Sequence, residues 1–338
     1  MTSCARSNNP FKRLYRLYQG HFHSQFLLLG IQLGVFNHLE REMTADEIAD
    51  RLQLHPTNTV HFLDGLVTIG LLEKCTDTYK NTDDSQAYLV QGTQTYLGDY
   101  LLYHAWWNTP LFENFEKILR EGPPQQEQTA DAEAIWASGA SAIANYQHVC
   151  TAPILSDMIS NLPEFPTFTR MLDLAGGPGL NAAAIVAAHP TMQAVLFDRP
   201  SVIDVAKGYI RDLKLEDRFT LMAGDFLSDP IGKAYDLVLA SACLNFAKPD
   251  LLGMITRIHE SLNPGGVLVS VHDGLTQWGT SPQSLALSLV PISMMWQDLH
   301  FEKGQIASAM VECGFKSVMS EPITYGVGEM VLDIGRKV

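Results

Sequence analysis

Cysteine is scarce in this chain of 338 residues, and its placement follows no motif. The cysteines are odd in number and form no Cys-x-x-Cys pair; they are Cys4, Cys75, Cys150, Cys243 and Cys313. This pattern predicts neither a disulfide framework nor a zinc site. No cluster of His, Asp and Glu has the spacing of metal ligands either, so we expect no metal-dependent mechanism.

Long apolar runs and excess positive charge are also missing. No stretch reaches the roughly 18–20 apolar residues that span a bilayer, and the basic N-terminal segment lacks the apolar core and cleavage site of a signal peptide. Lys and Arg number 23 against 37 Asp and Glu, which gives a net charge of −14. Nucleic acids need clustered cations. We therefore expect no nucleic acid or membrane partner and a cytoplasmic location.

The most informative segment of the chain runs from Met171 to Gly179, with the sequence Met-Leu-Asp-Leu-Ala-Gly-Gly-Pro-Gly. It predicts a buried strand, a glycine-rich turn and a helix that begins near Asn181. Glycine lets the backbone approach a ligand closely because it has no Cβ. A strand that leads through such a turn into a helix N-terminus is where α/β proteins hold nucleotide-like ligands.

Four further strands are expected after this turn. They lie at residues 193–197, 219–222, 235–240 and 267–271, and helical patterns at 181–189, 202–213 and 251–262 separate them. This alternation predicts a parallel sheet with right-handed crossovers. The strand at 193–197 is followed by Asp198, whose carboxylate can accept hydrogen bonds from both hydroxyls of a ribose. The strand at 219–222 leads to Asp225 and Phe226, which can contact the amino group and the ring of an adenine.

A segment of different character precedes the sheet. Helices are expected at 22–39, 45–52 and 57–69, with a capping box formed by Thr44 and Glu47, and a hairpin is expected between residues 71 and 80. Three helices and a hairpin predict a winged helix. The third helix carries no Lys or Arg, which argues against DNA reading. We expect this segment to form a homodimer instead, with the apolar first helix as the seam.

The segment between these two parts is aromatic and largely helical. Residues 96–119 are rich in Tyr, Trp and Phe, residues 121–131 predict a surface loop, and residues 132–159 predict a helix. A linker at 161–169 leads into the sheet. We therefore divide the chain into a dimerisation domain (1–105), pocket helices with a linker (106–168) and a sheet domain (169–338).

Two ligand classes fit the glycine turn and the acid downstream of it: dinucleotides and S-adenosylmethionine (SAM). The dinucleotide fingerprint G-x-G-x-x-G needs a glycine three residues after Gly179, and none is there. Asp173, the Gly-Asp-Phe sequence and the Asn-Pro-Gly-Gly turn at 263–266 instead resemble the class I SAM-dependent methyltransferases. An ordinary α/β sheet with glycine turns explains each motif separately but not the whole ordered set.

Over nearly its whole length, the chain resembles the O-methyltransferase family that includes caffeate and acetylserotonin methyltransferases. Three further sequences carry this resemblance: Leu33-Gly34-Val35-Phe36, Gly70-Leu71-Leu72 and Cys313-Gly314-Phe315. The resemblance implies a doubly wound, mostly parallel seven-stranded sheet, an N-terminal winged-helix dimerisation domain and a small-molecule acceptor. The expected SAM-binding residues are Asp173, Gly176, Gly177, Gly179, Asp198, Arg199, Gly224, Asp225, Phe226 and Ser241.

The chain departs from this family at two positions. Ala175 stands where the family usually has glycine, and Asn245 stands where the plant enzymes carry a histidine base. Asparagine cannot accept a proton at neutral pH. Either the acceptor needs no deprotonation, as for a thioether sulfur or a tertiary amine, or another residue is the base. His272 is the best candidate for that base, followed by His148 and His104.

We favour a thioether acceptor and base-free SN2 transfer, because the chain resembles enzymes that methylate methylthiohydroxybutyrate on the route to dimethylsulfoniopropionate. The alternatives are O-methylation with His272 as base, N- or C-methylation of another metabolite, and a SAM-binding regulator without turnover. Aromatic faces favour sulfonium cations. The expected acceptor-binding residues are Trp106, Trp107, Tyr146, Gln147, Asn245, Met295 and Trp296.

Overall fold

The computed structural model describes residues 11–123, 132–295 and 298–338. The chain divides into two compact units, Met1–Trp106 and Trp107–Val338. The division into three domains expected from the sequence stays a prediction. Within the described residues, no helix combines the length and the apolar character needed to cross a membrane.

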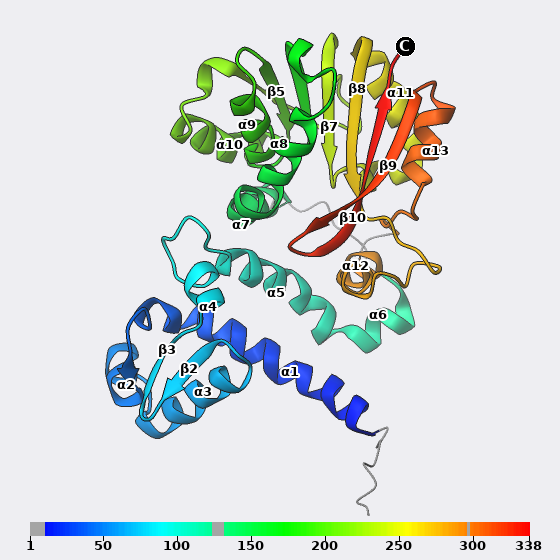
Figure 1. Cartoon of the computed structure of the whole chain (residues 1–338). Coiled ribbons are helices and arrows are strands. Elements are labelled where there is room, and N and C mark those ends of the chain that lie inside the picture. Colours follow the sequence, from blue (N-terminus) through cyan, green and yellow to red (C-terminus); the bar gives the residue numbers. More distant parts are fainter. Residues whose placement is uncertain (1–10, 124–131, 296–297) are drawn as a thin grey trace, which may run out of the picture. The chain divides into compact units, whose positions relative to one another are not determined.

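The first unit packs helices against a small antiparallel sheet (Figure 1). Its elements are α1 (Phe11–Gln32), a 3-10 turn η1 (Val35–His38), β1 (Met43–Thr44), α2 (Ala45–Leu52), α3 (Pro56–Thr68), β2 (Leu72–Cys75), β3 (Thr78–Asn81), α4 (Asp83–Tyr88) and the start of α5 (Gly98–Glu113). The strands lie in the order β1-β3-β2. Phe36, Ile48, Leu63 and Leu66 are fully buried in its core.

The capping box of α2 is present, but the first helix differs from its prediction. The backbone N–H of Glu47 donates to Thr44 Oγ1 at 3.3 Å, and the N–H of Thr44 donates to Glu47 Oε2 at 2.8 Å. The helix expected at 22–39 begins earlier and ends at Gln32, because Gly34 adopts the left-handed conformation with φ 68° and starts a separate 3-10 turn. The second and third helices and the hairpin are as expected; the winged-helix interpretation stays a prediction.

The second unit is built on a seven-stranded sheet in the order β6-β5-β4-β7-β8-β10-β9. The five strands from β6 to β8 are parallel, and β10 pairs antiparallel with both β8 and β9. The strands are β4 (Arg170–Leu174), β5 (Gln193–Asp198), β6 (Phe219–Ala223), β7 (Tyr235–Ser241), β8 (Leu262–His272), β9 (Lys316–Tyr325) and β10 (Gly328–Arg336). The mostly parallel, seven-stranded α/β fold is therefore confirmed.

Helices cover both faces of this sheet (Figure 1). The helical elements of the described part of this unit, besides the end of α5, are α6 (Phe115–Glu121), α7 (Ala132–Tyr146), the π-helical turn η2 (Gln147–Thr151), α8 (Ala152–Ser160), η3 (Phe165–Thr167), α9 (Leu180–Ala188), α10 (Pro200–Asp212), η4 (Glu216–Arg218), η5 (Leu244–Asp250), α11 (Leu251–Ser261), α12 (Gln283–Met295) and α13 (Gln305–Glu312). Side chains alternate along each strand: Leu172 packs in the core with α11 and α13, and Met171 in the core with α8 and α9.

The turn expected at 263–266 lies inside a strand. β8 begins at Leu262, and its pairing with β7 jumps from Tyr235–Leu262 to Leu237–Val267. The extra residues form a bulge in which Gly265 has φ 78°, a conformation that glycine adopts without strain. Of the loop expected at 121–131, residues 124–131 lie outside the described residues.

Candidate active site

The parallel strands bring the predicted cofactor residues to one edge of the sheet. β6, β5, β4 and β7 are neighbours, and their carboxyl ends carry Asp225, Asp198, the glycine turn and Ser241. In open α/β sheets, ligands bind outside the carboxyl ends of such strands.

The turn after β4 needs its glycines for two different reasons. A Cβ on Gly176 would lie 2.3 Å from Asp173 Oδ2 and 2.5 Å from Leu196 Cδ1, so a side chain has no room there. Gly177 and Gly179 have φ values of 63° and 81°, and Gly179 is the N-cap of α9. Ala175 also has a positive φ, 52°, which costs an alanine roughly 1–2 kcal/mol. Backbone strain of this kind persists mainly at functional sites.

Asp198 connects this turn to the end of β5, and its carboxylate can accept further hydrogen bonds. Its Oδ2 accepts from the N–H of Gly177 at 2.8 Å, and its Oδ1 accepts from the N–H of Arg199 at 2.7 Å. A carboxylate offers about four acceptor positions, so about two remain, which is what the two hydroxyls of a ribose require. Burial raises the pKa of this carboxyl. A ligand that donates to it therefore stabilises its charged form.

Asp173, the last-but-one residue of β4, is a buried acid with little local support. It is 1% exposed, and neither carboxylate oxygen accepts a hydrogen bond of normal geometry from the described residues. Burial, together with repulsion from Asp198, raises its pKa to about 7. A cationic group next to Asp173 would offset both effects. The residues present therefore fit SAM, with ribose acceptors at Asp198 and a buried acid for a cation at Asp173.

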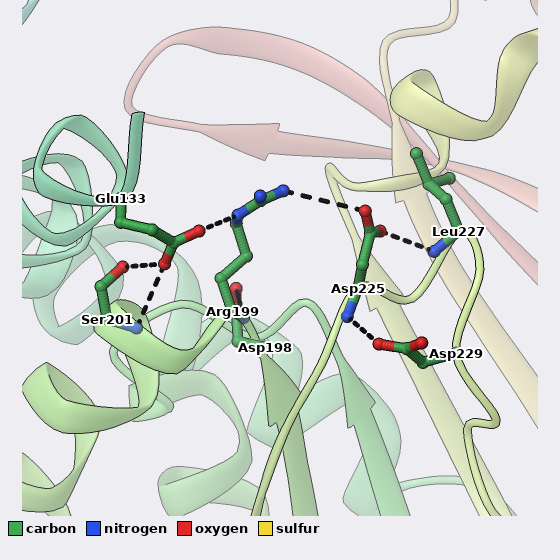
Figure 2. A network of polar contacts seen from close by, with 7 residues as sticks. All are labelled: Glu133, Asp198, Arg199, Ser201, Asp225, Leu227 and Asp229. Atoms are coloured by element: carbon green, nitrogen blue, oxygen red, sulfur yellow. Dashed lines mark hydrogen bonds and ion pairs between the residues drawn. The ribbon is translucent and has the colours of Figure 1, made fainter. Parts of the chain in front are cut away.

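The Arg199 side chain, next to Asp198 in the sequence, forms ion pairs with two carboxylates (Figure 2). Arg199 Nε donates to Glu133 Oε1 at 2.7 Å, and its Nη1 lies 3.9 Å from Asp225 Oδ2. Glu133 Oε2 also accepts from the Ser201 hydroxyl at 2.7 Å. The network thus connects α7, the N-terminus of α10 and the loop after β6. Glu133 was not predicted: within a long helical pattern, nothing in the sequence distinguishes it.

The loop after β6 is shaped by its own backbone contacts. Asp225 Oδ1 accepts from the N–H of Leu227 at 3.0 Å, and the N–H of Asp225 donates to Asp229 Oδ2 at 2.8 Å. A Cβ on Gly224 would lie 2.7 Å from Phe197 Cζ, so this glycine is required for packing. Phe226 is half-buried against the core on the α11 face. Ser241 is half-buried at the end of β7.

Asn245, in η5 after β7, is held by acceptors on two other segments. Its Nδ2 donates to Asp273 Oδ1 at 2.5 Å and to the carbonyl of Leu299 at 2.6 Å. Asp273, which follows β8, also accepts from the N–H of Phe301 at 2.6 Å through Oδ2. The position at which the resemblance implies a base is therefore filled by an amide donor, paired with a buried carboxylate.

His272, predicted as the alternative base, is placed differently. It is 1% exposed; its Nδ1 lies 2.6 Å from the carbonyl of Asp273, and its Nε2 lies 2.8 Å from Asp333 Oδ2. Ser320 in turn donates to Asp333 Oδ1. Both ring nitrogens contact protein oxygens in the core between β8, β10 and β9. This geometry gives both ring nitrogens a partner within the protein, and a role of His272 as base stays a prediction.

The other predicted histidines and aromatic residues belong to different elements of the two units. His148 is exposed and lines a surface groove between α8 and α9, and His104 is in the first unit, where burial lowers its pKa. Trp106 and Trp107 are neighbours in α5, on opposite sides of the boundary between the two units. For Trp106, Trp107 and Met295, the last residue of α12, an acceptor-binding role stays a prediction. Trp296 lies outside the described residues.

Tyr146 and Gln147 follow one another at the end of α7 but contact different segments. The Tyr146 ring packs on the turn between β9 and β10, where a Cβ on Gly326 would lie 3.3 Å from Cε2, and burial raises its pKa to about 12. Gln147 Nε2 donates to the carbonyl of Gly176 at 3.2 Å, and its Oε1 accepts from the N–H of Leu180 at 3.1 Å. Gln147 was predicted to bind the acceptor, and in the structure its amide is bound to the glycine turn.

Two family models and several curated proteins match the chain. The model of the O-methyltransferase domain family matches residues 120–309, and that of the O-methyltransferase dimerisation domain matches residues 15–91. The N,N-dimethyltransferase OxyT of Streptomyces rimosus is 28% identical over 337 residues, and the match covers 95% of each chain. The tetracenomycin polyketide synthesis 8-O-methyl transferase TcmO of Streptomyces glaucescens is 25% identical and covers 96% of each.

A solved structure shows the same fold. The crystal structure of human N-acetylserotonin methyltransferase in complex with SAM superimposes with a TM-score of 0.82. The superposition covers 98% of this chain and 99% of the human one, at 20% sequence identity.

Proposed function

Because this chain belongs to the O-methyltransferase family and is a SAM-dependent methyltransferase of small molecules, we propose that its acceptor is a neutral nucleophile. Such an acceptor attacks with a lone pair that it already carries and loses no proton beforehand. The observation that carries this proposal is the environment of Asn245. Its amide nitrogen donates to Asp273 and Leu299, and the site has no histidine in that position.

The residues of the site account for catalysis by alignment. SAM, when bound, supplies a methyl group that is activated by a sulfonium charge. Asp198 offers acceptors to the ribose, and the glycines of the turn carry no Cβ that would keep a ligand away from the backbone. Asp173 offers a buried carboxyl whose charged form would be stabilised by the cationic end of the cofactor. Alignment of two reactants in a dehydrated site is a sufficient source of rate for an acceptor that needs no deprotonation.

An arylamine nitrogen, which is not protonated near pH 7, and a thioether sulfur both satisfy this requirement. OxyT, which is 28% identical, is named as an N,N-dimethyltransferase, and this supports an amine acceptor for the present chain. The thioether favoured from the sequence, a methylthiohydroxybutyrate-like compound on the route to dimethylsulfoniopropionate, has the same chemistry, but the relatives named above give it no support. We therefore place the amine first and the thioether second.

A phenol would need a base, because its oxygen becomes a good nucleophile only after it loses a proton. TcmO is named as an O-methyl transferase, so this outcome is part of the test. Incubation with SAM and separate sets of arylamines, thioethers and phenols, followed by mass spectrometry, measures the methylated products. We expect turnover of amines or thioethers and little turnover of phenols. Phenol turnover as fast as that of amines would contradict the proposal, and no S-adenosylhomocysteine with any acceptor would indicate a SAM-binding regulator.

The variant Asn245→His tests the same idea by gain of function. Asp273 Oδ1 is 2.5 Å from the Asn245 amide, so it is placed to accept a hydrogen bond from an imidazole N–H and leave the other ring nitrogen as a base. General-base help is worth about 10²–10⁴-fold, and we expect phenol turnover to rise by about 10²-fold. Asn245→Gln is the matched control without a base. Equal phenol rates in both variants would contradict the assignment of position 245.

A further inference from the structure

We infer that Gln147 is a positioning residue that holds the glycine turn in the conformation that binds SAM. The inference rests on the cofactor and not on the proposed acceptor. One amide side chain bonds to both ends of a five-residue segment, since Nε2 donates to Gly176 and Oε1 accepts from Leu180. Between these ends lie Gly177, whose N–H donates to Asp198, and Gly179, which caps α9.

The two bonds satisfy backbone groups that the turn itself leaves in need of partners. Leu180 is the first residue of α9, and the first N–H groups of a helix have no partner within the helix. The N-cap is Gly179, which has no side chain to supply one. Gln147 Oε1 takes over this role from another helix. The carbonyl of Gly176 accepts from the N–H of Gly179 at 3.2 Å as well as from Gln147 Nε2, so the side chain also stabilises the turn on its other side.

The π-helical turn is what places Gln147 there. Gln147 begins η2, which widens the helical segment between α7 and α8, and π turns of this kind frequently occur at functional sites. The same turn is tied to α9 by the Thr151 hydroxyl, which donates to the buried Asn181 Oδ1 at 2.6 Å. Farther along, the Ser156 hydroxyl donates to the carbonyl of Ala184 at 3.2 Å. The side chain of Gln147 is therefore held against the turn by a helix that is itself attached to α9.

Gln147 also contacts the turn at Gly177, where a Cβ would have more room than at Gly176 or Gly179. A Cβ on Gly177 would lie 3.5 Å from Gln147 Nε2 and 3.4 Å from Ile143 Cδ1. The amide thus borders the residue whose N–H donates to Asp198, the expected ribose acceptor. Loss of the amide should release the turn and weaken the binding of SAM more than it slows methyl transfer from bound SAM.

Two variants test this inference. Gln147→Leu keeps the approximate size and removes both hydrogen bonds, and we expect the Kd for SAM to rise about 10-fold. The kcat at saturating SAM should change less than the KM for SAM. Gln147→Glu replaces the donor with an oxygen, which repels the carbonyl of Gly176 when the carboxyl is ionised. When it is protonated, its O–H can donate to Gly176 while the other oxygen accepts from Leu180.

The pH profile of Gln147→Glu therefore provides a readout that loss of packing would not give. Calorimetry with SAM between pH 5 and pH 8 should give a Kd close to that of the wild type at the acid end and weaker by about 10-fold at the alkaline end. The quantity compared is the ratio of the variant Kd to the wild-type Kd at each pH, because Asp173, Asp198 and His148 are common to both proteins.

Thr151→Val is the matched control on the same π turn. It removes the hydrogen bond to Asn181 but leaves the Gln147 amide in place, so thermal stability should fall while the Kd ratio stays independent of pH. Thermal unfolding of each variant identifies any loss of folding. A Kd for Gln147→Leu within twofold of the wild type, or a Kd ratio for Gln147→Glu that does not change with pH, would overturn the inference.

Discussion

At the scale of single residues, the site depends on two carboxylates that the fold places in unfavourable surroundings. Burial raises the pKa of both Asp173 and Asp198, and the charge of Asp198 raises that of Asp173 further. The carboxyl of Asp173 has a pKa near 3.8 in the unfolded chain and about 7 in the folded one. Its contribution to stability is therefore fully present below about pH 4 and is lost as the pH rises through 7. The empty site is destabilised by the charge that the cofactor needs.

This pair predicts that SAM binding releases protons near pH 6.5. A cation next to Asp173 favours its ionised form and lowers its pKa, so the carboxyl gives up the proton that it holds in the empty protein. Calorimetric titrations in two buffers of different ionisation enthalpy should give different apparent binding enthalpies. For Asp173→Asn, that difference should shrink, SAM should bind more weakly, and the empty protein should be more stable at pH 8. Identical binding enthalpies in both buffers for the wild type would count against this role of Asp173.

Residues in the site could be predicted where a motif and its spacing fix their place. Asp198 and Asp225 follow strands, and the carboxyl ends of neighbouring parallel strands meet at one edge, so their position followed from the strand pattern. Glu133 is 66 residues from its partner Arg199 along the chain, and no local pattern indicates that pairing. His272 illustrates the converse case. Its place at a strand end was predicted correctly, but its Nε2 contacts the carboxylate of Asp333, which is 61 residues away along the chain.

At the scale of elements, the parallel strands followed from the sequence and the irregular elements did not. Buried β-branched and apolar runs between helical patterns gave the strands from β4 to β8 to within a few residues. The pairing of β10 with β8 and β9 depends on contacts between distant segments, and the π turn of η2 on tertiary packing against α9. Neither is encoded in a local repeat. The end of α1 was missed because the apolar periodicity continues past Gly34.

The capping box of α2 gives a prediction at this scale. Thr44 and Glu47 satisfy two backbone N–H groups at the start of a short helix. Replacing an N-cap threonine by alanine costs about 0.5–2 kcal/mol, so Thr44→Ala should lower the free energy of unfolding of the first unit by this amount. Chemical denaturation followed by circular dichroism measures it. Thr44→Ser retains the hydroxyl and should restore most of the loss; equal destabilisation by both variants would contradict a capping role.

At the scale of the whole molecule, α1 presents a large apolar surface. Its exposed hydrophobic side chains are Phe11, Leu14, Tyr15, Leu17, Tyr18, Phe22 and Leu29. Contiguous apolar surface of this kind marks an interaction site, and residues 15–91 match the O-methyltransferase dimerisation domain. The sequence predicts the first helix as the seam of a homodimer, and its exposed face supports this prediction.

Introducing charge into this face should separate the subunits. The double variant Leu17→Glu, Tyr18→Glu places two carboxylates on surface that is more than half exposed in the single chain. Light scattering after size exclusion should give a mass near twice 37.4 kDa for the wild type and near 37.4 kDa for the variant. Lys12→Glu, which changes charge at an already polar position, is the control. A wild-type mass of one chain would refute the dimer. A dimeric mass for the double variant would show that α1 does not form the dimer interface.

The central claim is that methyl transfer in this site needs no protein base. The most direct test is the single-turnover rate with saturating SAM and an arylamine or thioether acceptor, which stays unprotonated between pH 6 and pH 8. A base with a pKa near neutrality would make the rate rise about 10-fold for each pH unit below that pKa. The account predicts a rate that is nearly constant over this range, in the wild type and in Asn245→Gln. A steep rise governed by one ionising group of the enzyme would contradict it.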